Sequence, residues 1–122
     1  MTAAMTATDD AYSEGAVIVS ALGNHPRAKI LAALLGDHER DLNASDIANM
    51  AGIERSTFYT HIETLLDFGL VKITREVGNS KMYAVNKESD AAKALAQFEW
   101  DLLDTLDEDG TPAARVDEAD VE

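Results

Sequence analysis

The 122-residue sequence predicts a mainly α-helical domain that carries one β-hairpin near its C-terminal end. Two observations predict this class. Apolar residues recur at steps of three and four in several segments before residue 68 and again after residue 89, which is the period of helices packed on a core. Between them, residues 70–85 change to β-branched and aromatic residues with a period of two, interrupted by Gly78-Asn79-Ser80. A chain of this length can bury one modest core.

The first two predicted helices precede residue 37. Residues 10–22 form the first, although the run AVIVS at residues 16–20 would also suit a strand. Acidic residues at its start and Gly23-Asn24 at its end favour the helix. His25-Pro26 opens the second helix, because a proline costs little in a first turn, and Gly36 ends it.

The next two helices are predicted to be joined by a tight turn. Asn43 caps the third helix, and Gly52 supplies the turn that a larger residue resists. Residues 54–68 form the fourth helix, and Gly69 ends it in the left-handed conformation. Its buried side is predicted to consist of Phe58, Ile62, Leu65 and Leu66.

A short strand at Leu42, the hairpin of residues 70–77 and 81–85, and a helix from Ser89 to Leu106 complete the elements. This order is that of a winged helix-turn-helix domain with extra N- and C-terminal dimerisation helices. The domain is predicted to span residues 11–106, with its core at residues 25–86. Residues 1–10 and the acidic residues 107–122 are predicted to be disordered.

The charge of this sequence is concentrated at its ends. The formal net charge is -13, but residues 25–86 carry seven basic and eight acidic residues and are close to neutral. An acidic partner-binding tail or adaptation to a very salty cytoplasm would explain this distribution, and surface-bound cations would accompany the second. No apolar run suits a membrane span, no secretory signal is evident, and the absence of cysteine excludes disulfides and thiolate metal sites. A cytoplasmic location is expected.

Two segments carry the residues suited to double-stranded DNA. The outer side of the fourth helix offers an arginine for guanine or phosphate, short hydroxyls and a tyrosine. These residues are Arg55, Ser56, Thr57, Tyr59 and Thr60. The hairpin, or wing, is the one net-basic stretch, and it would lie near the minor groove or flanking phosphates. Its candidates are Lys72, Arg75, Asn79, Ser80 and Lys81.

Structural roles compete with some of these interpretations. Arg55 would also suit an exposed ion pair with Glu54 or Glu63, and Tyr59 would suit half-burial on the helix. His61 is expected to be packed or hydrogen-bonded. No histidine pair has metal-ligand spacing, and no catalytic constellation or phosphate-binding loop appears. The sequence therefore predicts neither an enzyme, nor a metal site, nor a cofactor.

The last helix predicts a homodimer. Its apolar stripe is broader than one small domain needs, and a two-fold interface with the first helix would cover it. Packing within one chain is the alternative. The predicted dimerisation residues are Tyr12, Ile18, Leu22, Leu95, Phe98, Leu102, Leu103 and Leu106.

Residues 20–86 resemble ArsR-like regulators of bacteria and archaea. LGNHPRAKILAALL resembles their first helices, and STFYTHIETLLDFGLVKITREVGNSKMYAV resembles their recognition helix and wing. A family arginine often stands where this sequence has Thr60, which weakens the expected direct reading of bases. The whole chain also resembles small haloarchaeal regulators of the response to reactive oxygen species. The resemblance implies a dimeric transcription regulator, while a winged helix used only to bind proteins remains the alternative.

Overall fold

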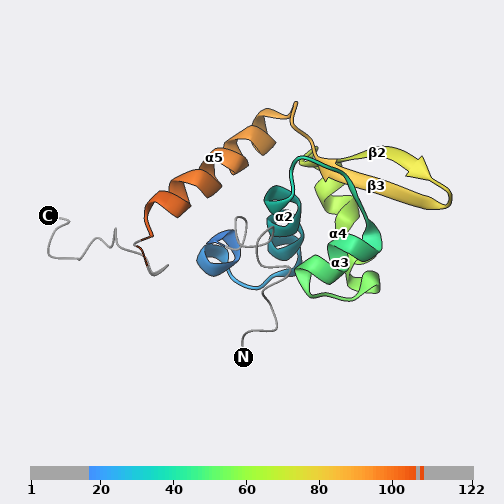
Figure 1. Cartoon of the computed structure of the whole chain (residues 1–122), viewed down its shortest axis with the longest axis horizontal. Helices are drawn as coiled ribbons and strands as arrows, with labels where there is room; N and C mark the ends of the chain where they lie inside the picture. Colours follow the sequence, from blue (N-terminus) through green and yellow to red (C-terminus); the bar gives the residue numbers. More distant parts are fainter. Residues whose placement is uncertain (1–16, 107, 109–122) are drawn as a thin grey trace, which may run out of the picture.

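The computed structural model describes residues 17–106 and residue 108 (Figure 1). Residues 17–22 are helical, as expected for this part of the ambiguous run. The rest of that helix, with Tyr12, lies outside the described residues. So do the predicted disordered ends, except for residue 108.

The structure confirms the mainly helical class with a β-hairpin wing. Three antiparallel strands pair in the order β1-β3-β2, so the two-residue strand β1 joins the wing at β3. The helices are α2 (Pro26–Gly36), α3 (Ala44–Ala51), α4 (Arg55–Asp67) and α5 (Asp90–Asp104). The strands are β1 (Leu42–Asn43), β2 (Val71–Val77) and β3 (Ser80–Val85).

Side-chain caps start three of these helices. The side-chain carbonyl oxygen of Asn43 accepts a hydrogen bond from the backbone N–H of Asp46 at 2.8 Å. Ser89 accepts one from the N–H of Ala92 at 3.2 Å. Both caps follow the sequence prediction, because short polar side chains satisfy the first free N–H groups of a helix. The start of α2 differs in kind, since the imidazole of His25 accepts from the N–H of Arg27 at 3.1 Å.

The turn between α3 and α4 depends on a left-handed residue. Gly52 has a φ of 71°, and its N–H donates to the Asn49 carbonyl at 3.2 Å. The next N–H, that of Ile53, donates to the Ala48 carbonyl at 3.0 Å. These bonds close the end of α3 and aim α4 across it.

Gly52→Ala should lower the free energy of unfolding by about 1–2 kcal/mol, because alanine disfavours the left-handed conformation. No atom lies within 4 Å of the added Cβ, so the cost is one of backbone conformation alone. Asparagine tolerates this conformation better, and Gly52→Asn should therefore lose less. Urea unfolding of both variants measures the difference, and equal losses would contradict the conformational explanation.

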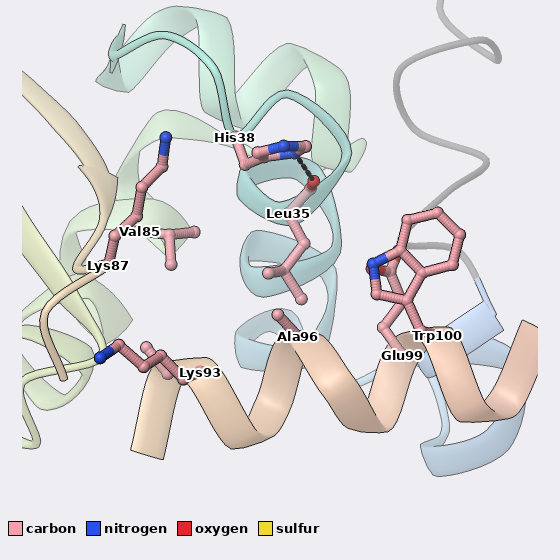
Figure 2. Close-up of a pocket in the computed structure, with 9 residues that line it drawn as sticks. Leu35, His38, Val85, Lys87, Lys93, Ala96, Glu99 and Trp100 are labelled. Carbon is pink, nitrogen blue, oxygen red and sulfur yellow. Dashed lines mark hydrogen bonds between the residues drawn. The ribbon is translucent and has the colours of Figure 1, made fainter. Parts of the chain in front are cut away.

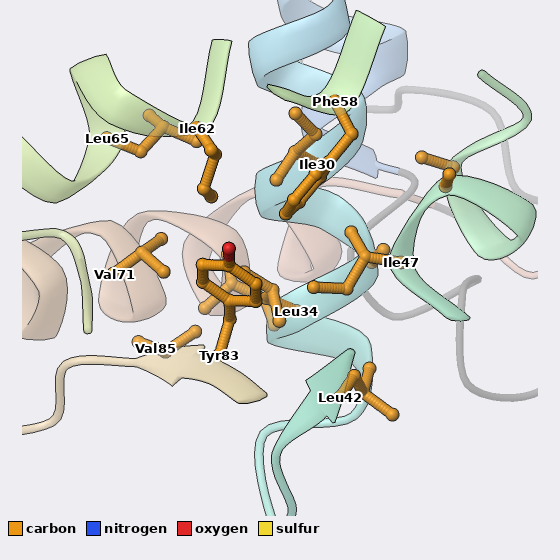
Figure 3. Packing of buried hydrophobic residues seen from close by; sticks show 14 of the residues in the cluster. Ile30, Leu34, Leu42, Ile47, Phe58, Ile62, Leu65, Val71, Tyr83 and Val85 are labelled. Carbon is orange, nitrogen blue, oxygen red and sulfur yellow. The ribbon is translucent and has the colours of Figure 1, made fainter. Parts of the chain in front are cut away.

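The core lies between α2, α3, α4 and the sheet (Figure 3). Phe58 is fully buried, and its ring meets the Tyr83 ring of β3 edge-on with centroids 5.2 Å apart. Ile30 and Leu34 of α2 are also almost fully buried. The period-of-three-and-four pattern therefore identified the core side of α4, apart from Leu66, which is only partly buried against it.

The predicted dimerisation residues have different surroundings. Ile18 is buried in the core of the single chain, so its side chain is already covered there, whereas Leu22 is 61% exposed. Figure 1 shows α5 extending along one side of the body toward residues 17–22. On α5, Phe98 and the neighbouring Trp100 are exposed. The partly buried members are Leu95, Leu102, Leu103 and Leu106.

Candidate nucleic-acid interface

A small polar pocket joins three parts of the winged domain. It has a volume of about 70 Å³ and lies between the start of α3, the first turns of α4 and the wing tip. The pairing of β1 with β3 explains this meeting, because Asn43 lies opposite Met82 and α3 begins at the next residue. The pocket is lined by Asn43, Ala44, Ser45, Arg55, Tyr59, Asn79, Ser80 and Lys81. Five predicted DNA-contacting residues are thus brought together.

Arg55 and Tyr59 form a unit on the exposed side of α4. The Arg55 Nη2 group donates a hydrogen bond to the Tyr59 hydroxyl at 3.3 Å, and the guanidinium carbon lies 5.7 Å from the ring centroid. The salt bridges among the described residues do not include Arg55, so its alternative as a partner of Glu54 or Glu63 does not form there. The ring orients the guanidinium and leaves most of its donors for a ligand.

The hydroxyl residues of α4 differ in what they can offer. Ser56 is exposed, while Thr57 is half-buried. The Thr60 hydroxyl donates to the Ser56 carbonyl at 2.9 Å. Thr60 therefore presents a methyl group and acceptor lone pairs outward, and hydrogen-bond donation from α4 depends on Arg55, Ser56 and Tyr59.

Arg75 is anchored at the base of the wing. Its Nε and Nη2 groups donate to the two carboxylate oxygens of Asp41 at 2.9 and 3.2 Å. A β-bulge leaves Thr74 unpaired in the ladder between Ile73 and Arg75, and the Thr74 hydroxyl donates to the same carboxylate. The Arg75 hydrogen bonds, followed by that from Thr74, lower the pKa of Asp41 to about 2. Two of the five Arg75 donors are thus occupied.

The Asp41–Arg75 pair predicts a specific loss of stability in acid. A carboxyl group whose pKa falls from 3.8 to about 2 on folding binds more protons when unfolded. Its contribution to stability is therefore complete above pH 3.8 and is lost as the pH falls toward 2. Asp41→Asn should flatten the dependence of the urea midpoint on pH in this window. A slope identical to that of the wild type would contradict a persistent pair.

The two wing lysines lie in different surroundings. Lys81 lines the polar pocket with Arg55 and Tyr59, while Lys72 lines a second hollow beside the loop that precedes β1. The structure therefore does not bring Lys72 together with the exposed face of α4. We name the pocket and the adjoining exposed side of α4 the α3–α4–wing face.

Sequence reasoning missed several residues around this face. Asn43 and Ser45 line the pocket, and Asp41 fixes Arg75. Behind α4, Arg27 donates from Nε to Nδ1 of His61 at 3.2 Å, which agrees with the expectation of a hydrogen-bonded histidine. Burial, and then the charges of Arg27 and His25, lower the pKa of His61 and favour its neutral ring. The cap at Asn43 was the available signal for the pocket, because it fixes where α3 begins.

The residues that the structure describes contain neither a metal-binding cluster nor a membrane-spanning helix. Within the described residues, no three His, Asp or Glu side chains gather in a way that would hold a metal ion. None of the helices described is both long and apolar enough to span a membrane.

The element order and the α3–α4–wing face define a winged helix-turn-helix protein. The model of the family described as "Sugar-specific transcriptional regulator TrmB" matches residues 27–88, slightly more than half of the chain. The chain belongs to this TrmB family of transcriptional regulators. The ArsR-like resemblance concerns the winged helix-turn-helix fold, which the solved structures described next also have. No curated protein matches the chain.

Three solved structures share the fold. Reduced HlyU from Vibrio cholerae is 23% identical with a TM-score of 0.53, over 74% of this chain and 88% of HlyU. A homodimeric winged helix-turn-helix DNA-binding domain from Mycobacterium bovis, a possible ArsR-family regulator, is 22% identical with a TM-score of 0.51, over 85% and 91% of the two chains. The transcriptional repressor CouR, bound to a 23-mer DNA duplex, is 24% identical with a TM-score of 0.53, over 88% and 74%.

Proposed function

We propose that this protein is a sequence-specific DNA-binding transcription regulator that acts as a homodimer. The observation that carries the proposal is the α3–α4–wing face, which gathers Arg55, Tyr59 and Lys81 on one surface of an otherwise acidic protein. On this proposal, α4 enters the major groove, and the wing tip lies over the adjacent backbone. The structure of CouR bound to a DNA duplex shows that a protein of this fold binds double-stranded DNA, which supports the proposal.

The pocket suits a backbone phosphate. Arg55 and Lys81 both line it and supply positive charge, and the Ser45 and Ser80 hydroxyls can donate hydrogen bonds. A phosphate held there would fix the register of α4 against the bases. Arg55 lies closest in sequence to the start of α4, the end of a recognition helix that commonly contacts base edges.

A two-fold dimer would cover the exposed apolar residues outside this face. Leu22, Phe98 and Trp100 are all exposed in the single chain, and they lie on residues 17–22 and on α5. The M. bovis domain, which shares the fold, is homodimeric, and this supports a homodimer. Two α4 helices would then lie about one DNA turn apart, roughly 34 Å, and would read an inverted repeat. Light scattering at several protein concentrations should find the dimer, and a monomer throughout would contradict it.

Adaptation to high salt is the second part of the proposal. The pocket presents two positive side chains, Arg55 and Lys81, while Arg75 lies outside it and is paired with Asp41. Few phosphates are then neutralised, and about four such contacts per dimer give a slope of log K against log salt near -4. We expect a salt titration of DNA affinity to give this shallow slope. We also expect the acidic surface of the protein to hold cations. A slope near that of about six or more phosphate contacts would contradict it.

The most specific part of the proposal is a cytoplasmic role in the response to oxidative stress. The resemblance of the sequence to haloarchaeal regulators of that response supports it. A chain without cysteine would need another sensor, such as oxidation of the half-buried Met50 or Met82. Comparing the operator affinity of the protein before and after mild oxidation tests this route, with Met50→Leu and Met82→Leu as matched controls. Unchanged affinity would contradict it.

Selection from a random DNA pool in molar KCl is the decisive experiment. We expect one inverted-repeat motif to be enriched, which would also give the half-site spacing. Circular dichroism and light scattering on the same sample establish that the protein is folded and dimeric. If the folded, dimeric protein enriches no DNA motif, the alternative is favoured: a winged helix that binds only proteins.

A further inference from the structure

Another cavity, distinct from the polar pocket and from the hollow lined by Lys72, lies beneath α5 (Figure 2). Its volume is about 230 Å³, and it lies between the C-terminal end of α2, the end of β3 and one side of α5. Leu35, Val85 and Ala96 give it apolar walls. A cavity with apolar walls and a few polar groups at its ends is the usual form of a small-molecule site.

The positive charge of this region is concentrated at the cavity. Residues 87–106 contain five acidic residues and two basic ones, and both basic residues, Lys87 and Lys93, line it. Figure 2 shows these lysines at the same end of the cavity. Neither forms a salt bridge with any residue that the structure describes. An anionic group would therefore be favoured at this end.

The opposite end has a different character. Glu99 is 5% exposed and lies beside Trp100 at the other end of the cavity (Figure 2). The indole there offers a flat apolar surface to a ligand. The two ends together select a molecule with one anionic head and an apolar body.

We propose that this cavity binds a small organic carboxylate with a cyclic apolar body, its carboxylate at Lys87 and Lys93 and its ring between Leu35, Ala96 and Trp100. The charge and shape of the cavity support it independently of the proposed DNA binding. The ligand would contact α5, the helix assigned above to the dimer.

Trp100 provides a direct measurement, because it is the only tryptophan in the chain. The full-length protein is titrated with cyclohexanecarboxylate and, separately, with the uncharged cyclohexanecarboxamide, at the lowest KCl concentration that keeps it folded. We expect a saturable change in Trp100 emission with the carboxylate and roughly ten-fold weaker binding of the amide. Equal affinities, or no saturation by the carboxylate in either fluorescence or calorimetry, would overturn the proposal.

Substitutions at the cavity test where the carboxylate binds. Lys87→Gln combined with Lys93→Gln should reduce the affinity for the carboxylate to that for the amide. Lys29→Gln, on α2 and not among the residues that line the cavity, should leave both affinities unchanged. Ala96→Leu should fill the cavity and abolish binding of both probes while the protein remains folded and dimeric. If Ala96→Leu instead dissociates a dimer, a second copy of the chain occupies the cavity and the ligand proposal is wrong.

Discussion

Replacement of Phe58 by alanine is expected to lower the free energy of unfolding by about 3–5 kcal/mol, the cost of removing a large buried ring and leaving a cavity. The Phe58 side chain is fully buried and meets the Tyr83 ring edge-on. It thus joins α4 to β3, and its loss weakens the contact that orients α4 against the wing. Urea unfolding at constant salt measures the change.

Phe68 provides a matched control for this prediction. It lies at the C-terminal end of the same helix and is 75% exposed, so the same substitution removes little buried surface. Phe68→Ala should change the free energy of unfolding by less than about 0.5 kcal/mol. If both variants lost similar stability, the core position assigned to Phe58 would be wrong.

Arg55→Ala is expected to weaken operator binding by about 1–3 kcal/mol per half-site. The loss arises because Arg55 combines a positive charge, an orientation fixed by Tyr59 and a place in the polar pocket. A second round of DNA selection with the variant should show relaxed preference at one base position in each half-site. Binding is measured on the enriched inverted repeat and on a scrambled duplex.

Arg40→Ala changes the net charge by the same amount at a different place. Arg40 is exposed, pairs with Asp37 at 2.7 Å and does not line the α3–α4–wing face. It should therefore leave sequence preference unchanged. Equal losses from Arg40→Ala and Arg55→Ala would indicate that only overall charge matters, and would contradict base reading by α4.

Features set by neighbouring residues could be predicted from the sequence. Asn43 and Ser89 cap helices because their short polar side chains reach the N–H group three residues ahead. Gly52 and Gly69 have positive φ, as their places after helices predicted. The wing followed from the period of two. Each of these signals lies within a few residues, so a single sequence displays it.

Features formed across the chain could not be predicted in the same way. Asp41 and Arg75 are 34 residues apart, and no periodicity indicates that a bulge at Thr74 turns the arginine toward the carboxylate. The burial of Ile18 depends on how its helix meets the rest of the core. The winged-helix features indicated the fold and the class of regulator, but they did not distinguish the TrmB family, whose model matches residues 27–88.

The junction at Asn43 limits how this architecture can change. The same residue ends β1, pairs with Met82 of the wing and caps α3, so no spare residue separates wing from helix. An insertion there would break the strand register and the cap together, whereas the loop of residues 37–41 can change length more readily. Evolution toward new operators is therefore expected to exchange side chains on α4 and the wing tip and to preserve the spacing at Asn43.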